Sequence, residues 1–79
     1  MQIRYSHHAR QRMRERRVSE AQVEYILAQP DELTIGEQDE WTAICTIGDR
    51  RIQVVYGDLE QEAEETVLIY TVISVRVLR

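Results

Sequence analysis

The residues best suited to chemistry lie near the start of the chain, between Ser6 and Ser19. This stretch, SHHARQRMRERRVS, holds both histidines and five of the ten arginines of a chain whose formal net charge is −4. In a helix, His8, Arg12 and Arg16 fall four residues apart and therefore lie along one stripe. Histidine can transfer a proton near neutral pH, and guanidinium groups are permanent cations that bind phosphate through paired hydrogen bonds. The spacing therefore predicts a phosphate-binding stripe with a proton-transfer group at one end.

The charge of the chain is unevenly distributed. Residues 1–19 contain six arginines and one glutamate, whereas residues 20–65 contain two arginines and thirteen acidic residues. Residues 66–79 add two more arginines, and the chain has no lysine at all. The chain is therefore bipolar, and its acidic balance differs from that of mRNA-cleaving proteins, which are usually basic.

The length and composition indicate one small domain over residues 1–79, with 43% hydrophobic and 30% charged residues. No apolar stretch approaches the roughly 18 residues of a membrane span, and the N-terminus has no apolar signal-peptide core, so no membrane partner is expected. Cys45 is the only cysteine, which excludes an intramolecular disulfide and favours a cytoplasmic location. One cysteine and two adjacent histidines do not have the spacing of a zinc site, so we expect no metal and no other cofactor.

The expected secondary structure changes from helical to extended at Pro30. Ser6 is a good N-cap for a helix that runs to about Arg16 or Arg17. Ser19 begins a capping box that opens a second helix, and this helix ends before Pro30. Beyond Pro30 the apolar residues alternate with polar ones, which predicts strands. The expected strands are Glu32–Gly36, Trp41–Ile47, Arg50–Tyr56 and Thr66–Leu78.

These strands are expected to form a three- to four-stranded antiparallel sheet. Gly48 and Asp49 suit a two-residue hairpin turn with glycine first, and Gly57–Glu65 would be an acidic connection to the last strand. We therefore predict an α+β fold with two N-terminal helices packed on one face of the sheet. The residues expected to be buried between them are Ala9, Met13, Val23, Ile26, Leu27, Ile52, Val54 and Ile69.

The last expected strand has two different faces. One face carries Val67, Ile69, Thr71, Ile73, Val75 and Val77. This apolar face is expected to pack on the helices, where Thr71, its only polar residue, would meet the stripe of His8, Arg12 and Arg16. The strand is also longer than Arg50–Tyr56, so part of its edge should lack a partner. An unpaired apolar edge favours a homodimer or a heteromeric complex.

Residues 6–23, SHHARQRMRERRVSEAQV, resemble the signature of a bacterial family of small domains of unknown function. The signature is Ser-x-His-Ala-x-x-Arg-Met-x-x-Arg, followed by a small residue, a β-branched residue and Ser, and the resemblance continues more weakly over nearly the whole chain. That family is similar to the BrnT and RelE toxins, in which helices pack on a small antiparallel sheet and which cleave RNA without a metal. The resemblance implies that His8 is the family histidine and that Arg12 and Arg16 are the signature arginines. Arg17 stands where glycine is common, which puts a tight turn with positive φ in doubt.

Metal-free RNA cleavage needs a base for the 2′-hydroxyl, an acid for the leaving 5′-oxygen and cations around the phosphate. His8 would lie in the first helical turn, where the positive helix end favours the neutral imidazole of a general base. Arg12 and Arg16 would supply the positive charge, and Thr71 would complete the catalytic set. The expected RNA-binding residues are Arg10, Arg51, Tyr56 and Tyr70.

Two classes of function remain open. The first is a metal-independent endoribonuclease of toxin type, or a degenerate relative of one, which acts on RNA and pairs with an antitoxin. The second is a non-catalytic protein-interaction module of the same fold, which binds its partner through a sheet edge. In the second case His8 caps its helix, and Arg12 and Arg16 pair with acidic residues of segment 20–65. DNA binding by the two helices is disfavoured because the second helix exposes acidic side chains.

Overall fold

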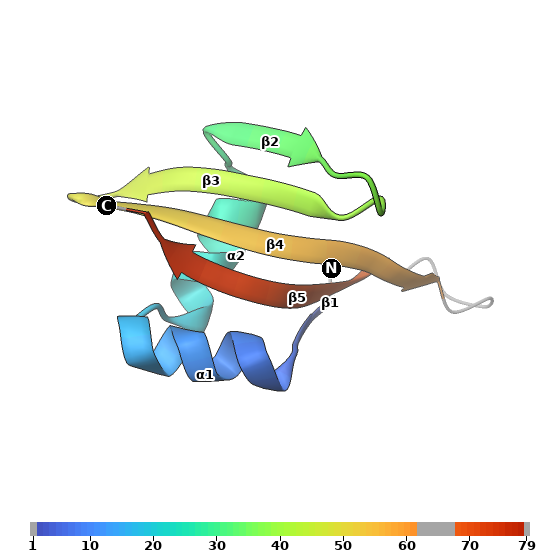
Figure 1. Cartoon of the computed structure of the whole chain (residues 1–79), viewed down its shortest axis with the longest axis horizontal. Helices are drawn as coiled ribbons and strands as arrows, with labels where there is room; N and C mark the ends of the chain where they lie inside the picture. The colour runs from blue at the N-terminus through green and yellow to red at the C-terminus, as the bar shows by residue number, and fades with distance from the viewer. Residues whose placement is uncertain (1, 62–67, 79) are drawn as a thin grey trace.

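The computed structural model describes residues 2–61 and 68–78. The chain forms two helices and five strands: β1 (Gln2–Tyr5), α1 (His7–Arg16), α2 (Glu20–Ala28), β2 (Glu32–Ile35), β3 (Trp41–Ile47), β4 (Arg50–Gln61) and β5 (Leu68–Val77). The strands make one sheet in the order β1-β5-β4-β3-β2 (Figure 1). Neither helix of the described residues has the length and apolarity that crossing a membrane would require.

The α+β class and both helices were predicted correctly, but the expected three- to four-stranded antiparallel sheet was wrong. The sheet has five strands and is mixed, because Gln2–Tyr5 pairs in parallel with Ile69–Val72. A parallel pair needs no nearby turn, so the local sequence carries no signal for it. Strand β4 also runs beyond Tyr56 to Gln61, into the segment expected to be a connection. The hairpin turn at Gly48 and Asp49 is confirmed, with glycine at a φ of 62°.

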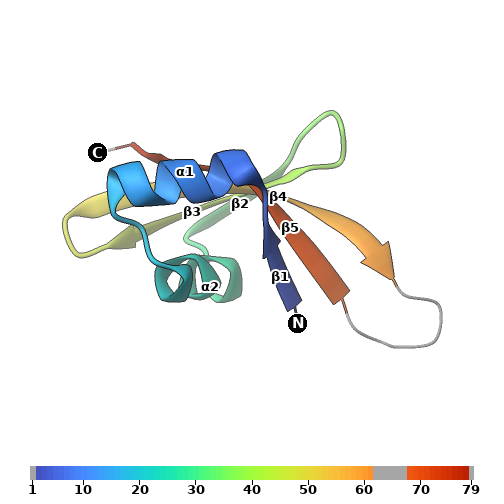
Figure 2. The ribbon, with the colours of Figure 1, turned by 90° about the horizontal axis from the view of Figure 1, so that it is seen from below.

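Ser6 joins β1 to α1 and fastens both to β5. Its hydroxyl accepts a hydrogen bond from the Ala9 amide at 3.0 Å, which satisfies one of the free donors of the first helical turn. Its own amide donates to the Val72 carbonyl at 2.9 Å, and its hydroxyl donates to the Ile73 carbonyl at 3.0 Å. Because β1 continues directly into α1 (Figure 2), this one residue fixes where the helix starts beside β5.

The junction between the helices depends on a left-handed residue and on an arginine from the sheet. Arg17 ends α1 with φ 55° and ψ 50°, the conformation that the resemblance associates with glycine. Ser19 then caps α2 through the expected capping box with Gln22. From the start of β4, the Arg50 guanidinium donates to the carbonyls of Arg16 and Arg17, the second at 2.9 Å. This contact satisfies free carbonyls at the end of α1 and holds that end against the hairpin.

The core lies between the two helices and one face of the sheet. Helix α1 packs on β5, and α2 packs on β3 and β4, so the expectation that both helices cover the same face is confirmed. The buried residues are Ala9, Met13, Val18, Val23, Ile26, Ala43, Cys45, Ile52, Val54, Tyr56, Val72 and Val75. Leu27 packs partly against this cluster, and the side chain of Ile69 lies outside the described residues.

The predicted faces of the last strand were correct at Val75 and Val77 but wrong around Ile73, because β5 contains a β-bulge. Val55 pairs with Ser74, but the next residue, Tyr56, pairs with Val72, so Ile73 is an extra residue in β5. An extra residue exchanges the two faces of a strand. As a result Val72 is fully buried, Ile73 is 42% exposed, and the inward face resumes at Val75. Val67, also expected on the inward face, lies outside the described residues.

We predict that Arg17→Gly increases the free energy of unfolding by about 0.5–1 kcal/mol, because glycine adopts the left-handed conformation without a steric penalty from Cβ. The measurement is the urea midpoint, with Arg17→Ala as the matched control, since alanine removes the charged side chain but retains Cβ. Equal stability of the glycine and alanine variants would show that the left-handed conformation costs nothing here.

Candidate functional site

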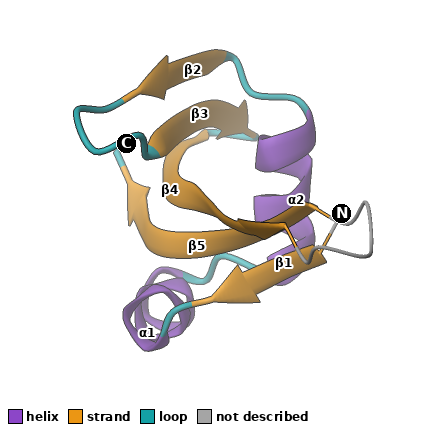
Figure 3. Ribbon diagram, turned by 90° about the vertical axis from the view of Figure 1, so that its right-hand side faces the viewer, coloured by secondary structure: helices purple, strands orange, loops and turns teal. Residues whose placement is uncertain are grey.

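Helix α1 and β1 together occupy the side of β5 that faces away from β4. Strand β1 pairs with Ile69–Val72, and α1, seen end-on in Figure 3, lies next to β1 on the same side of β5. Figure 1 shows that α1 runs along β5. Among the described residues, none pairs as a strand with Ile73–Val77 on this side. The free edge of β5 therefore faces a helix across a gap, and this gap is where the chemistry-bearing residues gather.

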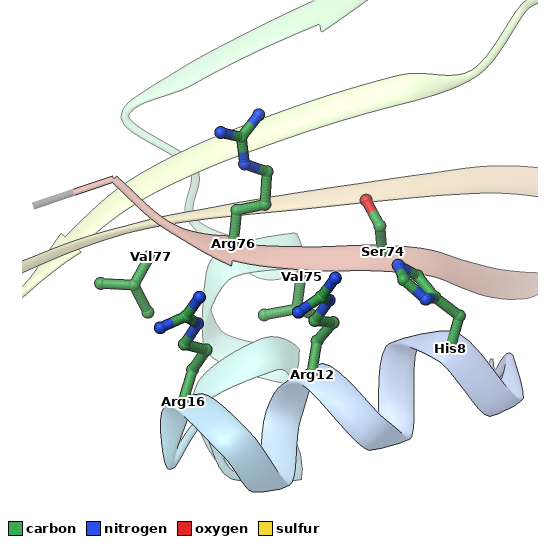
Figure 4. Close-up of a pocket in the computed structure, with 7 residues that line it drawn as sticks. All are labelled: His8, Arg12, Arg16, Ser74, Val75, Arg76 and Val77. Carbon is green, nitrogen blue, oxygen red and sulfur yellow. The ribbon is translucent and has the colours of Figure 1, made fainter.

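The gap is a groove of about 440 Å³ between α1 and β5. The side chains of His8, Arg12 and Arg16 project from α1 toward β5 (Figure 4). On the same helix, Ala9 and Met13 are buried in the core, so α1 packs through these two residues and leaves the basic stripe beside the sheet. We call this site the arginine groove; its lining residues are His8, Arg12, Arg16, Ser74, Val75, Arg76 and Val77.

The arginine groove is strongly cationic, with three guanidinium groups and no carboxylate among its lining residues. Arg12 pairs with Glu15 of the next helical turn at 3.0 Å, whereas Arg16 and Arg76 have no ion pair within the described residues. The pKa of the Glu15 carboxyl lies below its ordinary value, because Gln11 donates a hydrogen bond to it and because Arg12 and Arg16 stabilise its negative charge. An exposed pair of this kind contributes little to stability, so Arg12 remains available to a bound anion.

The backbone of β5 adds hydrogen-bond donors to the groove. The Leu78 amide donates to the Arg51 carbonyl of β4 at 2.7 Å. Ladder hydrogen bonds alternate along an antiparallel strand, so Ser74 and Arg76 also direct their peptide groups to β4. The amides of Val75 and Val77 are therefore directed to the opposite edge, which faces α1. Backbone amides beside guanidinium groups form a suitable environment for phosphate oxygens.

The structure brings together three of the four expected catalytic residues. His8, Arg12 and Arg16 line the groove, but Thr71 does not. Thr71 lies in the register between Arg4 of β1 and Gly57 of β4, where β1 covers the edge. Three residues along a strand separate it from Ser74, a distance of about 10 Å. Ser74, further along β5, is the hydroxyl-bearing residue that lines the groove in its place.

The four expected RNA-binding residues lie away from the groove. Arg10 pairs with Glu20 at 3.0 Å, and its guanidinium lies 4.8 Å from the centre of the Tyr5 ring. Arg51 pairs with Glu32 on the sheet. Tyr56 is buried and packs edge-to-face on Tyr70, with 5.5 Å between ring centres. The Tyr56 ring is thus occupied by core contacts and is not presented to a base.

Two side chains of the groove escaped the sequence analysis. Arg76 has a detectable signal, since it is the one charge within the β-branched run of β5. Ser74 has none, because it lines the groove only through the packing of α1 along this part of β5, which the strand sequence does not indicate. Among the described residues, no three His, Cys, Asp or Glu side chains gather as metal ligands would. The groove thus combines anion-binding groups with one imidazole.

Comparison with known proteins identifies a family match. Residues 5–74 match a domain of unknown function, DUF4258. The matched range includes α1 and, from β5, Ser74 of the groove. No curated protein and no solved structure matches the chain. The chemistry of the groove therefore has to be inferred from its own residues.

We predict that Glu15→Gln strengthens binding of a short single-stranded RNA about two- to fivefold, because it removes the carboxylate that competes for Arg12. Fluorescence anisotropy at low salt measures the affinity. The control is Glu24→Gln on α2, which changes the net charge equally at an exposed position outside the groove. If both variants bind equally well, the gain comes from net charge alone and Glu15 does not compete for Arg12.

Proposed function

Because the chain belongs to DUF4258, a family whose function is unknown, we propose a function from its groove: a metal-independent endoribonuclease of toxin type. The observation that supports this proposal is the alignment of His8, Arg12 and Arg16 along one groove. The groove joins a proton-transfer group to three guanidinium groups, two of them without an ion pair among the described residues. A base and surrounding cations are two of the requirements of phosphodiester cleavage without a metal.

In this proposal the arginines hold the phosphate and His8 moves a proton. Guanidinium groups of Arg12 and Arg16 bind the non-bridging oxygens and stabilise the additional negative charge of the transition state. His8 accepts the proton of the neighbouring 2′-hydroxyl, whose oxygen attacks the phosphorus atom. The bond from phosphorus to the 5′-oxygen breaks, and that oxygen takes a proton from water. The hydroxide that remains takes the proton from His8, which regenerates the neutral imidazole. The products are a 2′,3′-cyclic phosphate and a 5′-hydroxyl.

The sheet side of the groove would orient the substrate. Ser74 lines the groove together with His8, and its hydroxyl would donate to a phosphate oxygen or accept from the ribose. Arg76 extends from the same strand and would bind the next phosphate along the chain. The outward amides of Val75 and Val77 add neutral donors that do not depend on side-chain conformation. Each of these contacts is available to RNA without a change in the fold.

The alternative of a non-catalytic module that pairs through the free edge of the last strand is less favoured. Strand β1 occupies the first part of that edge, and α1 lies beside the remainder. A partner strand would have to displace the helix that carries His8. The arginine groove suits a nucleic-acid backbone better than it suits a further strand.

We predict that His8→Ala lowers the rate of RNA cleavage by about 10²- to 10⁴-fold, the usual contribution of a general base, while RNA affinity stays within about twofold. Cleavage is measured with an end-labelled single-stranded RNA, and the cyclic phosphate end is identified by its mass. His7→Ala is the control, because His7 is the adjacent exposed histidine and does not line the groove. The ribonuclease proposal fails if wild-type protein leaves RNA intact, or if both variants lose activity equally.

Arg16→Ala is expected to weaken RNA binding about 10- to 100-fold, since a hydrogen bond to a charged group contributes about 1.5–3 kcal/mol. The slope of the logarithm of the affinity against the logarithm of the salt concentration should also become shallower by about one, because one fewer counterion is released on binding. Titrations over a range of salt concentrations test both effects. Arg14→Ala is the matched control, because it removes an exposed arginine of the same helix outside the groove. Equal losses for the two variants would indicate diffuse attraction to α1 and not binding in the groove.

A further inference from the structure

The two outermost strands of the sheet, β1 and β2, differ in how much apolar side-chain surface they expose to solvent. In β1, Ile3 and Tyr5 pack against the core, and the exposed side chain is the cation Arg4. All four residues of β2 are exposed, and they include Leu33 at 46% and Ile35 at 59%. Strand β2 is therefore the apolar edge of the sheet.

The peptide groups of Leu33 and Ile35 are directed away from the sheet. The Gly36 amide donates to the Glu40 carbonyl at 2.8 Å, which places Gly36 in a hydrogen-bonded pair across the turn. Because such pairs alternate along an antiparallel ladder, Thr34 also directs its peptide groups to β3. Leu33 and Ile35 then present two amides and two carbonyls outward, which is the template for a further strand.

Strand β2 also lacks the features that usually prevent edge pairing. Natural edge strands are protected by lysine, proline, bulges or inward-pointing charges. The segment from Glu32 to Ile35 contains no basic residue or proline, and its ladder with β3 is regular. Its one charge, Glu32, is already paired with Arg51. The apolar side chains of β2 are thus open to a partner on the face that the helices share.

The charges around β2 indicate what kind of partner fits. Acidic residues flank the strand at both ends, and residues 31–40 contain no basic residue. These acidic residues are Asp31, Glu32, Glu37, Asp39 and Glu40. Pairing with a second copy is opposed, because the twofold register that matches Leu33 with Ile35 places Asp31 opposite Glu37 of that copy. A strand with basic residues at both ends is attracted instead.

We propose that β2 is a docking edge for an extended segment of another protein, which adds to the sheet as a sixth strand. The segment has apolar residues at alternate positions, to cover Leu33 and Ile35, and has lysine or arginine on both sides. Main-chain hydrogen bonds supply the affinity, and the flanking charges make the edge selective for basic segments over acidic ones. Because β4 and β3 separate β2 from β5, the strand that lines the arginine groove, this surface does not depend on the proposed ribonuclease activity.

The test uses a defined probe peptide, acetyl-Arg-Arg-Val-Thr-Ile-Thr-Val-Arg-Arg-amide, and the whole chain. We expect saturable binding with a dissociation constant of about 100 μM or lower, measured by fluorescence anisotropy. Amide chemical shifts should change along β2 and β3 and not around α1. A peptide with glutamate in place of every arginine should bind at least about tenfold more weakly.

Two variants and one control locate the binding edge. Ile35→Pro removes an outward amide without removing a ladder bond, and Leu33→Lys places a charge on the apolar surface while keeping the backbone intact. Each should weaken binding about tenfold or more. Ile73→Lys changes an exposed isoleucine of β5 in the same way and should leave binding within about twofold. Circular dichroism of each variant establishes that it is folded.

The proposal is overturned if the basic peptide does not bind, if folded Leu33→Lys binds it normally, or if the acidic peptide binds equally well. It is also overturned if sedimentation shows a dimer of the wild-type chain that Ile35→Pro abolishes, since β2 would then serve a second copy. None of these results depends on RNA cleavage. A chain without ribonuclease activity that binds the peptide at β2 would contradict the proposed function alone.

Discussion

The seating of α1 against β5 at Ser6 is the contact on which the other features depend. One serine ends a strand, caps a helix and hydrogen-bonds to two consecutive carbonyls, of Val72 and Ile73. These two residues lie where the bulge begins, so the start of the helix and the shift in the strand occur at one place. The distance between α1 and the free edge of β5 is set there, and so is the width of the arginine groove.

The far end of α1 is held by different chemistry. Arg50 binds the helix carbonyls from the β3–β4 hairpin, while Ala9 and Met13 fix the middle of the helix in the core. With both ends and the buried face fixed, the basic stripe is held on a rigid element. A rigid cationic site retains its geometry when an anion binds, so little ordering of α1 is needed for binding.

The sequence predicted the elements whose signals are local. Caps at Ser6 and Ser19, the helix stop before Pro30 and the glycine of the hairpin all act within a few residues. The stripe of His8, Arg12 and Arg16 was likewise predictable, since helical spacing alone aligns it. The alternation of Gln2–Tyr5 suits an extended segment, but its parallel pairing with β5 was not predictable, and neither was the bulge, because both depend on pairing between distant segments. Thr71 was misplaced for this reason, as simple alternation cannot include an extra residue.

The two walls of the arginine groove are far apart in the order of synthesis. Helix α1 is translated early, but β5 follows it only after α2 and three further strands have been made. Most of the contacts of α1 with the sheet are therefore non-local. They form only after the intervening chain has lost the conformational entropy that closing a long loop requires. Until β5 leaves the ribosome, the basic stripe has no opposite wall, and Ser74 and Arg76 are absent from the site. The groove is thus a product of completed folding, and a nascent chain carries its cations without the site.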